Sequence, residues 1–342
     1  MNSRFKQHWY KKPELTPLWL KWLSAVSRFY NRLRHIGYNL LFFRIYRAPL
    51  PVIAIGNASV EGRASTEMVA WLTMVLKKKG LHPGIVKDGI GGNATVWPQQ
   101  VRPDSDSYVV GGRALRIARL CQCPMAVGSD MAQAAKALVR QRKVDVIIAF
   151  GALNYPNLSR DIEIALLDEK STLGNGLAYP YGPNLASLRR LEGVDFRVVI
   201  NGQAQPHEFS LEVKLKHAVN VKSPRTTANF DEFKAKKVHL VADELGLAML
   251  KKPLNDTGIK PIEHNLSEGF EVTESSFEDN DNNVVLMEEK DAVECERFAK
   301  ANFWFLRTIT EVDAELEKQV LALVEKKLAN RKQKWITSYS TS

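Results

Sequence analysis

Residues 48–66 decide the fold that we expect, and they read Ala-Pro-Leu-Pro-Val-Ile-Ala-Ile-Gly-Asn-Ala-Ser-Val-Glu-Gly-Arg-Ala-Ser-Thr. A short apolar run leaves through Gly56 into a polar loop, and a helical pattern follows from about Ser65 to Lys79. A strand, a glycine-containing loop and a helix in this order form the layout of a phosphate-binding loop. In such a loop the backbone N–H groups and the helix N-terminus hold phosphates.

The rest of the chain extends this pattern into an α/β fold. Strand-like runs alternate with helical stretches near 113–121 and 130–142; they are 84–87, 124–127, 145–150, 162–168 and 197–201. Strands separated by helices of this length predict a mostly parallel sheet with helices on both faces, as in P-loop NTPases. Beyond residue 202 the pattern is mixed, with further strands at 209–215, 238–241, 284–287 and 303–306 and a polar, solvated loop at 271–283. We therefore expect a core at 48–201 and a smaller α/β lobe with a C-terminal helix at 202–342.

The net charge of +10 is concentrated at the front of the chain. Residues 1–47 contain ten Lys and Arg against the single acid Glu14, so the folded body is nearly neutral. A nucleic-acid partner would require basic residues spread over the body, and we predict none. The three cysteines, Cys121, Cys123 and Cys295, are too few for a disulfide framework or a structural zinc site, so we interpret them as reduced thiols and predict no metal site from them.

The basic front end also has the pattern of an amphipathic helix. Apolar residues recur every three or four positions from Leu18 to Leu40, with basic and polar residues between them. The uncharged runs are shorter than the ~20 residues that span a bilayer. Trp and Phe beside Lys and Arg suit a helix that lies on an anionic membrane surface, and the candidate contacts are Lys21, Trp22, Arg28, Phe29 and Arg32. The alternative is a helix docked on its own domain.

As a phosphate loop, residues 57–66 lack the usual chemistry. A working loop needs glycines for close backbone approach, a Lys for the β and γ phosphates, and a hydroxyl for Mg²⁺. Here the candidate nucleotide-binding residues are Gly62, Arg63, Ser65 and Thr66, without a Lys.

The strand and loop nevertheless resemble those of the tetraacyldisaccharide 4'-kinases of lipid A biosynthesis, whose loop reads G-N-x-x-V-G-G-[ST]-G-K-T. Aligned without a gap, Gly62 and Thr66 are retained, while Glu61 and Ala64 replace glycines and Ser65 replaces the Lys. Other segments are similar to family segments in the same order, from about residue 15 to 328. Residues 82–92 are similar to a segment ending S-R-G-Y-G-G, residues 159–164 to A-R-D-I-E-I, and residues 174–183 to G-N-G followed by L-P-A-G-P. Residues 287–295 are similar to M-T-E-K-D-A-V-K-C, and residues 302–305 to the strand that follows it.

The resemblance implies a P-loop kinase fold, ATP and Mg²⁺ as cofactors, and a catalytic site from which this chain departs. The family has an Asp in G-D-E-P where this chain has Gly112, and an Asp pair in D-D-G-x-Q-H where it has Phe150 and Gly151. The family's His, which pairs with the first Asp, falls on His264. New cations occur at Arg63, Lys87 and Arg113, which either converge on an anion or are solvated surface charges.

Two functional readings follow from this resemblance. The first is a relative with impaired or no catalysis, peripheral on the cytoplasmic face of the inner membrane, which binds a lipid A precursor (an acylated disaccharide phosphate) or a pathway enzyme. The second is an active kinase that phosphorylates the 4' position of tetraacyldisaccharide 1-phosphate. In that reading Arg63 or Lys87 replaces the loop Lys, and Glu61 or Asp88 holds Mg²⁺.

Overall fold

The computed structural model describes residues 8–9, 16–39, 45–60, 64–140, 143–168, 174–186, 188–266, 272–273, 276–277 and 283–340. In the larger lobe the elements are α2 (Leu18–Asn39), β1 (Val52–Asn57), α3 (Ser65–Lys78), β2 (Pro83–Asp88), β3 (Gln99–Val101), α4 (Ser107–Val110), α5 (Gly112–Cys121), β4 (Met125–Gly128), α6 (Met131–Arg140), β5 (Val146–Phe150), η2 (Ala152–Asn154), β6 (Ile162–Asp168), α7 (Leu188–Glu192) and β7 (Phe196–Ile200). They are followed by β8 (Phe209–Asn220), β9 (Thr227–Ala228), η3 (Phe230–Phe233), β10 (Lys237–Ala242), α8 (Glu244–Asp256), β11 (Ile262–Asn265), β12 (Asn283–Glu288), α9 (Glu289–Cys295), β13 (Phe303–Val312) and α10 (Ala314–Ser340).

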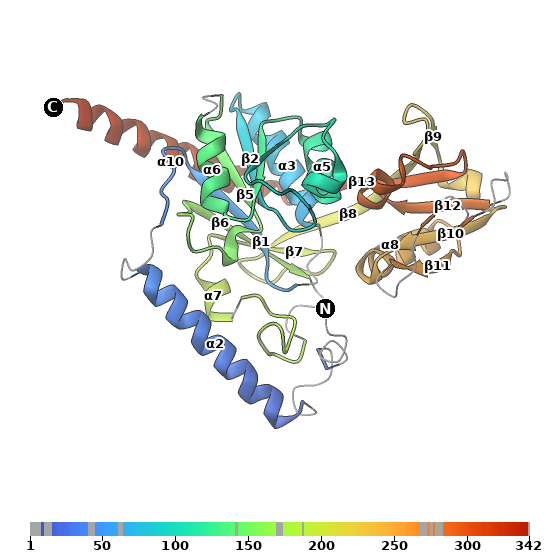
Figure 1. Ribbon diagram of the computed structural model, residues 1–342, viewed down its shortest axis with the longest axis horizontal. Helices are drawn as coiled ribbons and strands as arrows, with labels where there is room; N and C mark the ends of the chain where they lie inside the picture. Colours follow the sequence, from blue (N-terminus) through green and yellow to red (C-terminus); the bar gives the residue numbers. More distant parts are fainter. Residues whose placement is uncertain are drawn as a thin grey trace.

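A single sheet runs through both lobes (Figure 1), in the order β11-β10-β12-β13-β8-β7-β6-β1-β5-β2-β4-β3. Most neighbours are parallel; the antiparallel pairs are β3 with β4, β8 with β13, and β8 with β9. β1 is central in the larger lobe and lies parallel between β5 and β6. The predicted α/β fold with a mostly parallel sheet is therefore confirmed.

Alternating side chains of β1 explain why helices cover both faces of the sheet. Ile53 and Ile55 belong to a buried cluster with α3 and α5, whereas Val52 and Ala54 belong to a second cluster with α6. Successive residues of a strand point to opposite faces, so an entirely apolar strand requires a cover on each side.

Two long strands connect the lobes. β8 pairs with β7 at its beginning and with β13 along most of its length, and Figure 1 shows both strands reaching from the larger into the smaller lobe. α10 returns to the larger lobe, because its buried Leu316, Val320 and Val324 belong to the same apolar cluster as α3. The division of the chain at residue 202 remains a prediction, but the C-terminal helix that it assigned to the smaller lobe packs on the core.

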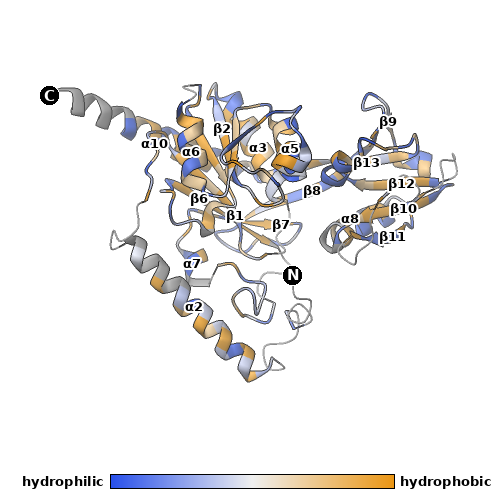
Figure 2. Ribbon diagram, viewed as in Figure 1, coloured by the Kyte–Doolittle hydropathy of each residue, from blue (hydrophilic) through white to orange (hydrophobic). Residues whose placement is uncertain are grey.

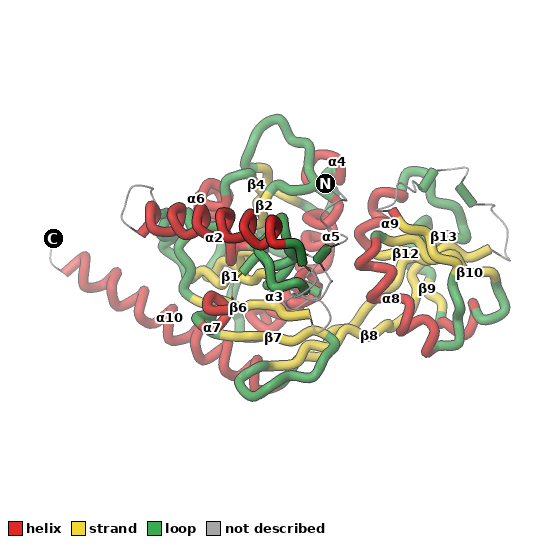
Figure 3. Tube along the Cα trace, turned by 90° about the horizontal axis from the view of Figure 1, so that it is seen from below, coloured by secondary structure: helices red, strands yellow, loops and turns green. Residues whose placement is uncertain are grey.

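α2 lies apart from the sheet and crosses in front of the larger lobe when seen from below (Figure 3). Its apolar stripe is exposed and its contact with the protein is narrow: Leu20 and Ser24 are buried, whereas Trp22 is 69% and Phe29 63% exposed. Figure 2 shows hydrophobic residues along this isolated helix. In the part of the chain that the structure describes, no helix is long and apolar enough to span a bilayer.

Candidate functional site

The carboxyl ends of β1, β5 and β2 lie side by side and form the expected ligand edge of the sheet, since ligands of open α/β sheets bind there. β1 leads into the phosphate-loop segment and β5 into η2. The end of β1 is tightly packed against η2, because a Cβ on Gly56 would lie 2.9 Å from Leu153. This edge is therefore the expected position of the ligand-binding groups.

Two of the four predicted nucleotide-binding residues are described. Ser65 and Thr66 begin α3 and are each only 5% exposed, and Ala64 before them has a left-handed backbone with φ of 54°. Gly62 and Arg63 lie outside the described residues, as does Glu61. The helix N-terminus thus stands at the end of β1, as the sequence predicts.

Lys87, at the end of β2, is buried and its ammonium group is fully occupied. Its Nζ donates to Asp88 Oδ1 at 2.6 Å, to the Asp88 carbonyl at 3.0 Å and to the Ile90 carbonyl at 3.1 Å. Burial lowers the pKa of Lys87, and the adjacent Asp88 partly opposes this effect. An ammonium group has three protons, so binding a phosphate would require Lys87 to break one of these bonds.

Asp88 lies beside the position of one missing family acid. Its Oδ2 atom is 3.5 Å from where a Cβ on Gly151 would stand, and it accepts a hydrogen bond of 3.3 Å from the hydroxyl of Tyr155. A second carboxylate has the same relation to the other glycine, since Oε1 of Glu294 is 3.0 Å from where a Cβ on Gly112 would stand. Carboxylates from β2 and α9 therefore lie near the two positions that the sequence resemblance assigns to family acids.

Arg113 belongs to the same region. It is exposed in the first turn of α5, and its charge acts on Lys87, Glu67 and Asp243 strongly enough to shift their pKa values. The convergence of these cations on an anion remains a prediction, and Arg63 lies outside the described residues.

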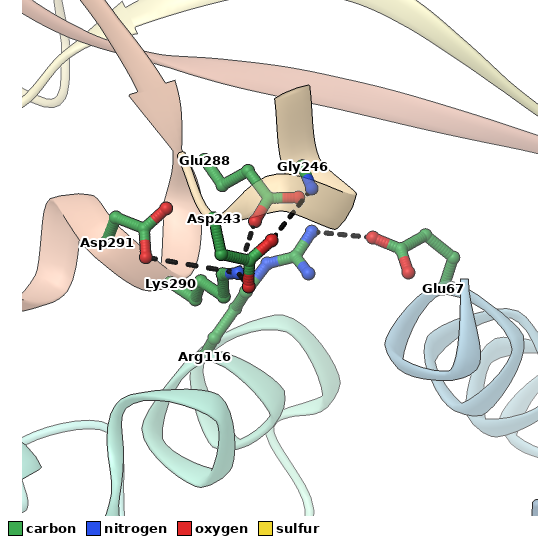
Figure 4. A network of polar contacts seen from close by, with 7 residues as sticks. All are labelled: Glu67, Arg116, Asp243, Gly246, Glu288, Lys290 and Asp291. Atoms are coloured by element: carbon green, nitrogen blue, oxygen red, sulfur yellow. Dashed lines mark hydrogen bonds and ion pairs between the residues drawn. The ribbon is translucent and has the colours of Figure 1, made fainter. Parts of the chain in front are cut away.

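A buried ion-pair network, which sequence reasoning missed, joins the lobes beside this edge (Figure 4). Arg116 of α5 donates to Glu67 of α3 at 2.8 Å and to Glu289 of α9 at 3.1 Å, and Arg307 of β13 pairs with Glu289 at 3.1 Å. Burial would raise the pKa of Glu67, but the charge and hydrogen bond of Arg116 outweigh it and hold the pKa below its usual value.

Lys290 of α9 forms the second half of the network. Its Nζ lies 2.6 Å from Asp243, 2.5 Å from Glu288 and 4.0 Å from Asp291. Asp291 is 9% exposed, and its Oδ2 atom has no hydrogen-bond partner among the described residues. Burial raises the pKa of Asp291 to about 8; Lys290 opposes the rise, and the charges of Glu288 and Asp243 add to it.

The signal for this network in the sequence was weak. The acids and bases come from four separate segments, and single Glu or Lys residues at helix starts are usually solvated. The run Glu288-Glu289-Lys290-Asp291 was recognised only as part of a family segment.

His264 lies in β11, at the far end of the sheet order. Its Nε2 is 2.8 Å from Nδ1 of His239, and its ring packs edge-on against Phe277. Burial and the charge of Lys237 lower the pKa of His264. The neighbours found for Gly112 are Glu294 and Lys290 of α9, so the pairing of His264 with this position remains a prediction.

The described residues contain no preformed cluster of three metal ligands. No group of three His, Cys, Asp or Glu side chains within them is arranged to hold a metal ion. Asp88, the acid at the end of β2, is already the ion-pair partner of Lys87 at 2.6 Å. We therefore derive no step through a metal.

A central parallel strand, a loop, a helix and polar groups at the adjacent strand ends define a P-loop NTPase-like fold. The comparisons agree with this class. The model of the tetraacyldisaccharide-1-P 4'-kinase family matches residues 16–328. A crystal structure of LpxK from Aquifex aeolicus in complex with ATP superposes with a TM-score of 0.71 at 19% identity, over 89% of this chain and 98% of that one.

Curated relatives extend over nearly the same length. The tetraacyldisaccharide 4'-kinase of Nitrosococcus oceani is 34% identical over 332 residues, 95% of each chain. That of Tolumonas auensis is 31% identical over 319 residues, 92% of this chain and 95% of the relative. The chain therefore belongs to the tetraacyldisaccharide 4'-kinase family.

Proposed function

We propose that this family member binds an acylated disaccharide phosphate, a lipid A precursor, at the cytoplasmic face of the inner membrane and transfers phosphate to it poorly or not at all. The observation that carries the proposal is the bonding of Lys87, whose ammonium group donates three hydrogen bonds, two to Asp88 and one to the Ile90 carbonyl. The ammonium group of Lys87 is therefore already hydrogen-bonded within the protein, and it could bind a phosphate only by breaking one of these bonds.

The energetic argument concerns the groups that stabilise a transferring phosphoryl group. Catalysis of this transfer is mainly positioning and electrostatic stabilisation by a Lys and Mg²⁺. Loss of one stabilising group typically costs ~3 to 4 kcal/mol, or about 100- to 1,000-fold in rate. Ser65 stands where the family has the Lys, and Phe150 and Gly151 stand where it has the acids. These losses support binding without efficient turnover.

The membrane part of the proposal is supported by the exposed stripe of α2. Five of its apolar side chains are about half exposed or more, at helical spacing: Leu18, Trp22, Val26, Phe29 and Leu33. Lys21 is half-buried and Arg28 is exposed on the same helix. Large apolar side chains beside basic ones favour the interface of an anionic bilayer. Arg32 belongs to the same proposed surface by sequence.

A second candidate function is the family's kinase reaction, in which ATP would phosphorylate the 4' position of tetraacyldisaccharide 1-phosphate. The observation that favours it is the place of Asp88, 3.5 Å from where a side chain at Gly151 would begin. In this reading the Asp88 carboxylate substitutes for a missing acid. It would then have to break its ion pair with Lys87 before it could contact the reacting groups.

One assay separates the two functions. The full chain is incubated with γ-labelled ATP, Mg²⁺ and tetraacyldisaccharide 1-phosphate, and lipid binding is measured in parallel by flotation of vesicles that carry the lipid. The variants are Asp88→Asn and, as a positive control, the restored loop Glu61→Gly, Ala64→Gly, Ser65→Lys. We expect lipid binding without transfer by the natural chain.

Transfer by the natural chain that is lost in Asp88→Asn would establish the second function instead. If neither transfer nor lipid binding occurs, both functions fail.

A further inference from the structure

We propose that the segment of residues 174–186, here called the strap, couples the binding of α2 to a lipid surface to the order of residues 58–60, which follow β1. The inference rests on the proposed membrane contact of α2. Through the strap, the membrane contact of α2 would affect residues 58–60, which lie at the ligand edge of the sheet.

The outer side of the strap is bonded to the N-terminal part of the chain. Ser24 Oγ of α2 accepts a hydrogen bond of 3.0 Å from the Ala178 amide, and Ser27 Oγ donates to the Tyr179 carbonyl at 3.2 Å. Trp9, 1% exposed, donates from its indole nitrogen to the Pro180 carbonyl at 3.1 Å. α2 is thus fixed to the strap through side chains on its buried face.

The inner side of the strap is bonded to the segment before the phosphate loop. The Val60 amide donates to the Pro183 carbonyl at 2.9 Å, and the Leu185 amide donates to the Ala58 carbonyl at 2.9 Å. Ser59 and Asn184 form an antiparallel bridge. Residues 58–60 therefore gain their backbone partners on this side from the strap, while the Ala58 amide is held to β6 through the Leu166 carbonyl.

The strap itself is tightly built, which allows a displacement on one side to reach the other. Gly182 has no room for a side chain, since a Cβ there would lie 2.3 Å from the Leu177 carbonyl oxygen. Asn184 donates from Nδ2 to the same carbonyl at 3.0 Å, and its own carbonyl accepts from the Tyr179 amide at 2.9 Å. Turns that are closed by several internal bonds move as units more readily than they deform.

The face of α2 that is turned away from the strap is the exposed apolar stripe. Burial of Trp22 and Phe29 in a lipid interface would restrain the helix, and the restraint would pass through Ser24 and Ser27 to the strap. Fewer conformations of the strap mean fewer conformations of residues 58–60, so ordering at one site lowers the entropic cost of ordering at the other. Coupling of this kind is reciprocal between the two sites.

The test is hydrogen–deuterium exchange of the full chain with and without vesicles containing about 30% anionic phospholipid. We expect the vesicles to slow exchange at the amides of α2 and also at Val60 and Leu185, the latter by about fivefold or more, the low end of typical coupling. Ser27→Ala combined with Ser24→Ala should bind the vesicles equally well but lose most of the added protection at Val60. If Ser24→Ala prevents folding, Ser27→Ala alone should reduce that protection.

The outcomes separate the coupling from the membrane contact on which it rests. Vesicle binding without slower exchange at Val60 and Leu185 in the natural chain overturns the coupling and leaves the membrane proposal standing. Failure of the natural chain to bind the vesicles overturns both. As a reciprocal check, Trp22→Ala with Phe29→Ala should abolish vesicle binding and the added protection together, because these side chains touch the lipid and not the strap.

Discussion

Asp291 offers a quantitative test of the charge network between the lobes. Its buried carboxyl group has a pKa of about 8 in the folded protein against an ordinary value of 3.8. Between these values the folded state holds one proton more than the unfolded state, so the free energy of unfolding falls as pH rises, by about 1.4 kcal/mol per unit. The stabilisation is complete below pH ~4 and is lost as pH rises through the folded pKa.

Asp291→Asn retains the shape of the protonated acid and removes its titration. From pH 5.5 to 7.5 the natural chain should lose about 2 to 3 kcal/mol of unfolding free energy relative to this variant. Urea unfolding followed by tryptophan fluorescence at the two pH values measures the difference. The matched control is Asp256→Asn, because Asp256 is exposed at the end of α8 and lies outside the network. Equal differences between the natural chain and Asp291→Asn at both pH values would refute the reasoning.

Three further results are expected. Arg116→Ala should cost about 3 to 5 kcal/mol in urea unfolding because it leaves the buried Glu67 without its ion-pair partner and leaves Glu289 with Arg307 alone, whereas Arg119→Ala on the same helix, whose partner is the more exposed Glu296, should cost less than about 1 kcal/mol. Trp22→Ala with Phe29→Ala should weaken partition into anionic vesicles by about two to three orders of magnitude, since each ring contributes ~1.5 to 2 kcal/mol for the area that it exposes, and Met74→Ala should not change partition. Lys87→Met should destabilise the chain more than Lys87→Met combined with Asp88→Asn, and a purely additive double variant would show that the pair is not coupled.

The sequence alone was sufficient to predict the order of strands and helices and the parallel sheet. The apolar run before Gly56 and the alternation of strands with helices identified β1, α3 and the parallel sheet, because burial on both faces leaves a continuous apolar signature. It was insufficient where two distant segments share a contact. The segment 271–283 appeared to be a solvated loop, yet Phe277 is 7% exposed and packs against Phe303 and His239.

The amphipathic pattern of α2 left its buried face undecided for a similar reason. Periodicity shows that a helix has an apolar stripe, but it does not show which side the protein covers. The structure covers the side with Leu20 and Ser24 and leaves Trp22 and Phe29 exposed. The sequence does not indicate that a serine in a helix accepts a hydrogen bond from a backbone amide 154 residues further along the chain, as Ser24 does from Ala178.

Gly112 and Gly151 stand at the two positions that the sequence resemblance assigns to family acids. At both positions a carboxylate from a neighbouring element, Glu294 or Asp88, reaches the space beside the missing side chain. Asp88 also neutralises Lys87, and a buried ammonium without such a partner would be strongly destabilising. The same carboxylate therefore preserves the charge balance at the end of β2 and holds the ammonium group of Lys87, so under the proposed function the stability of this edge and its response to a phosphate would depend on one ion pair.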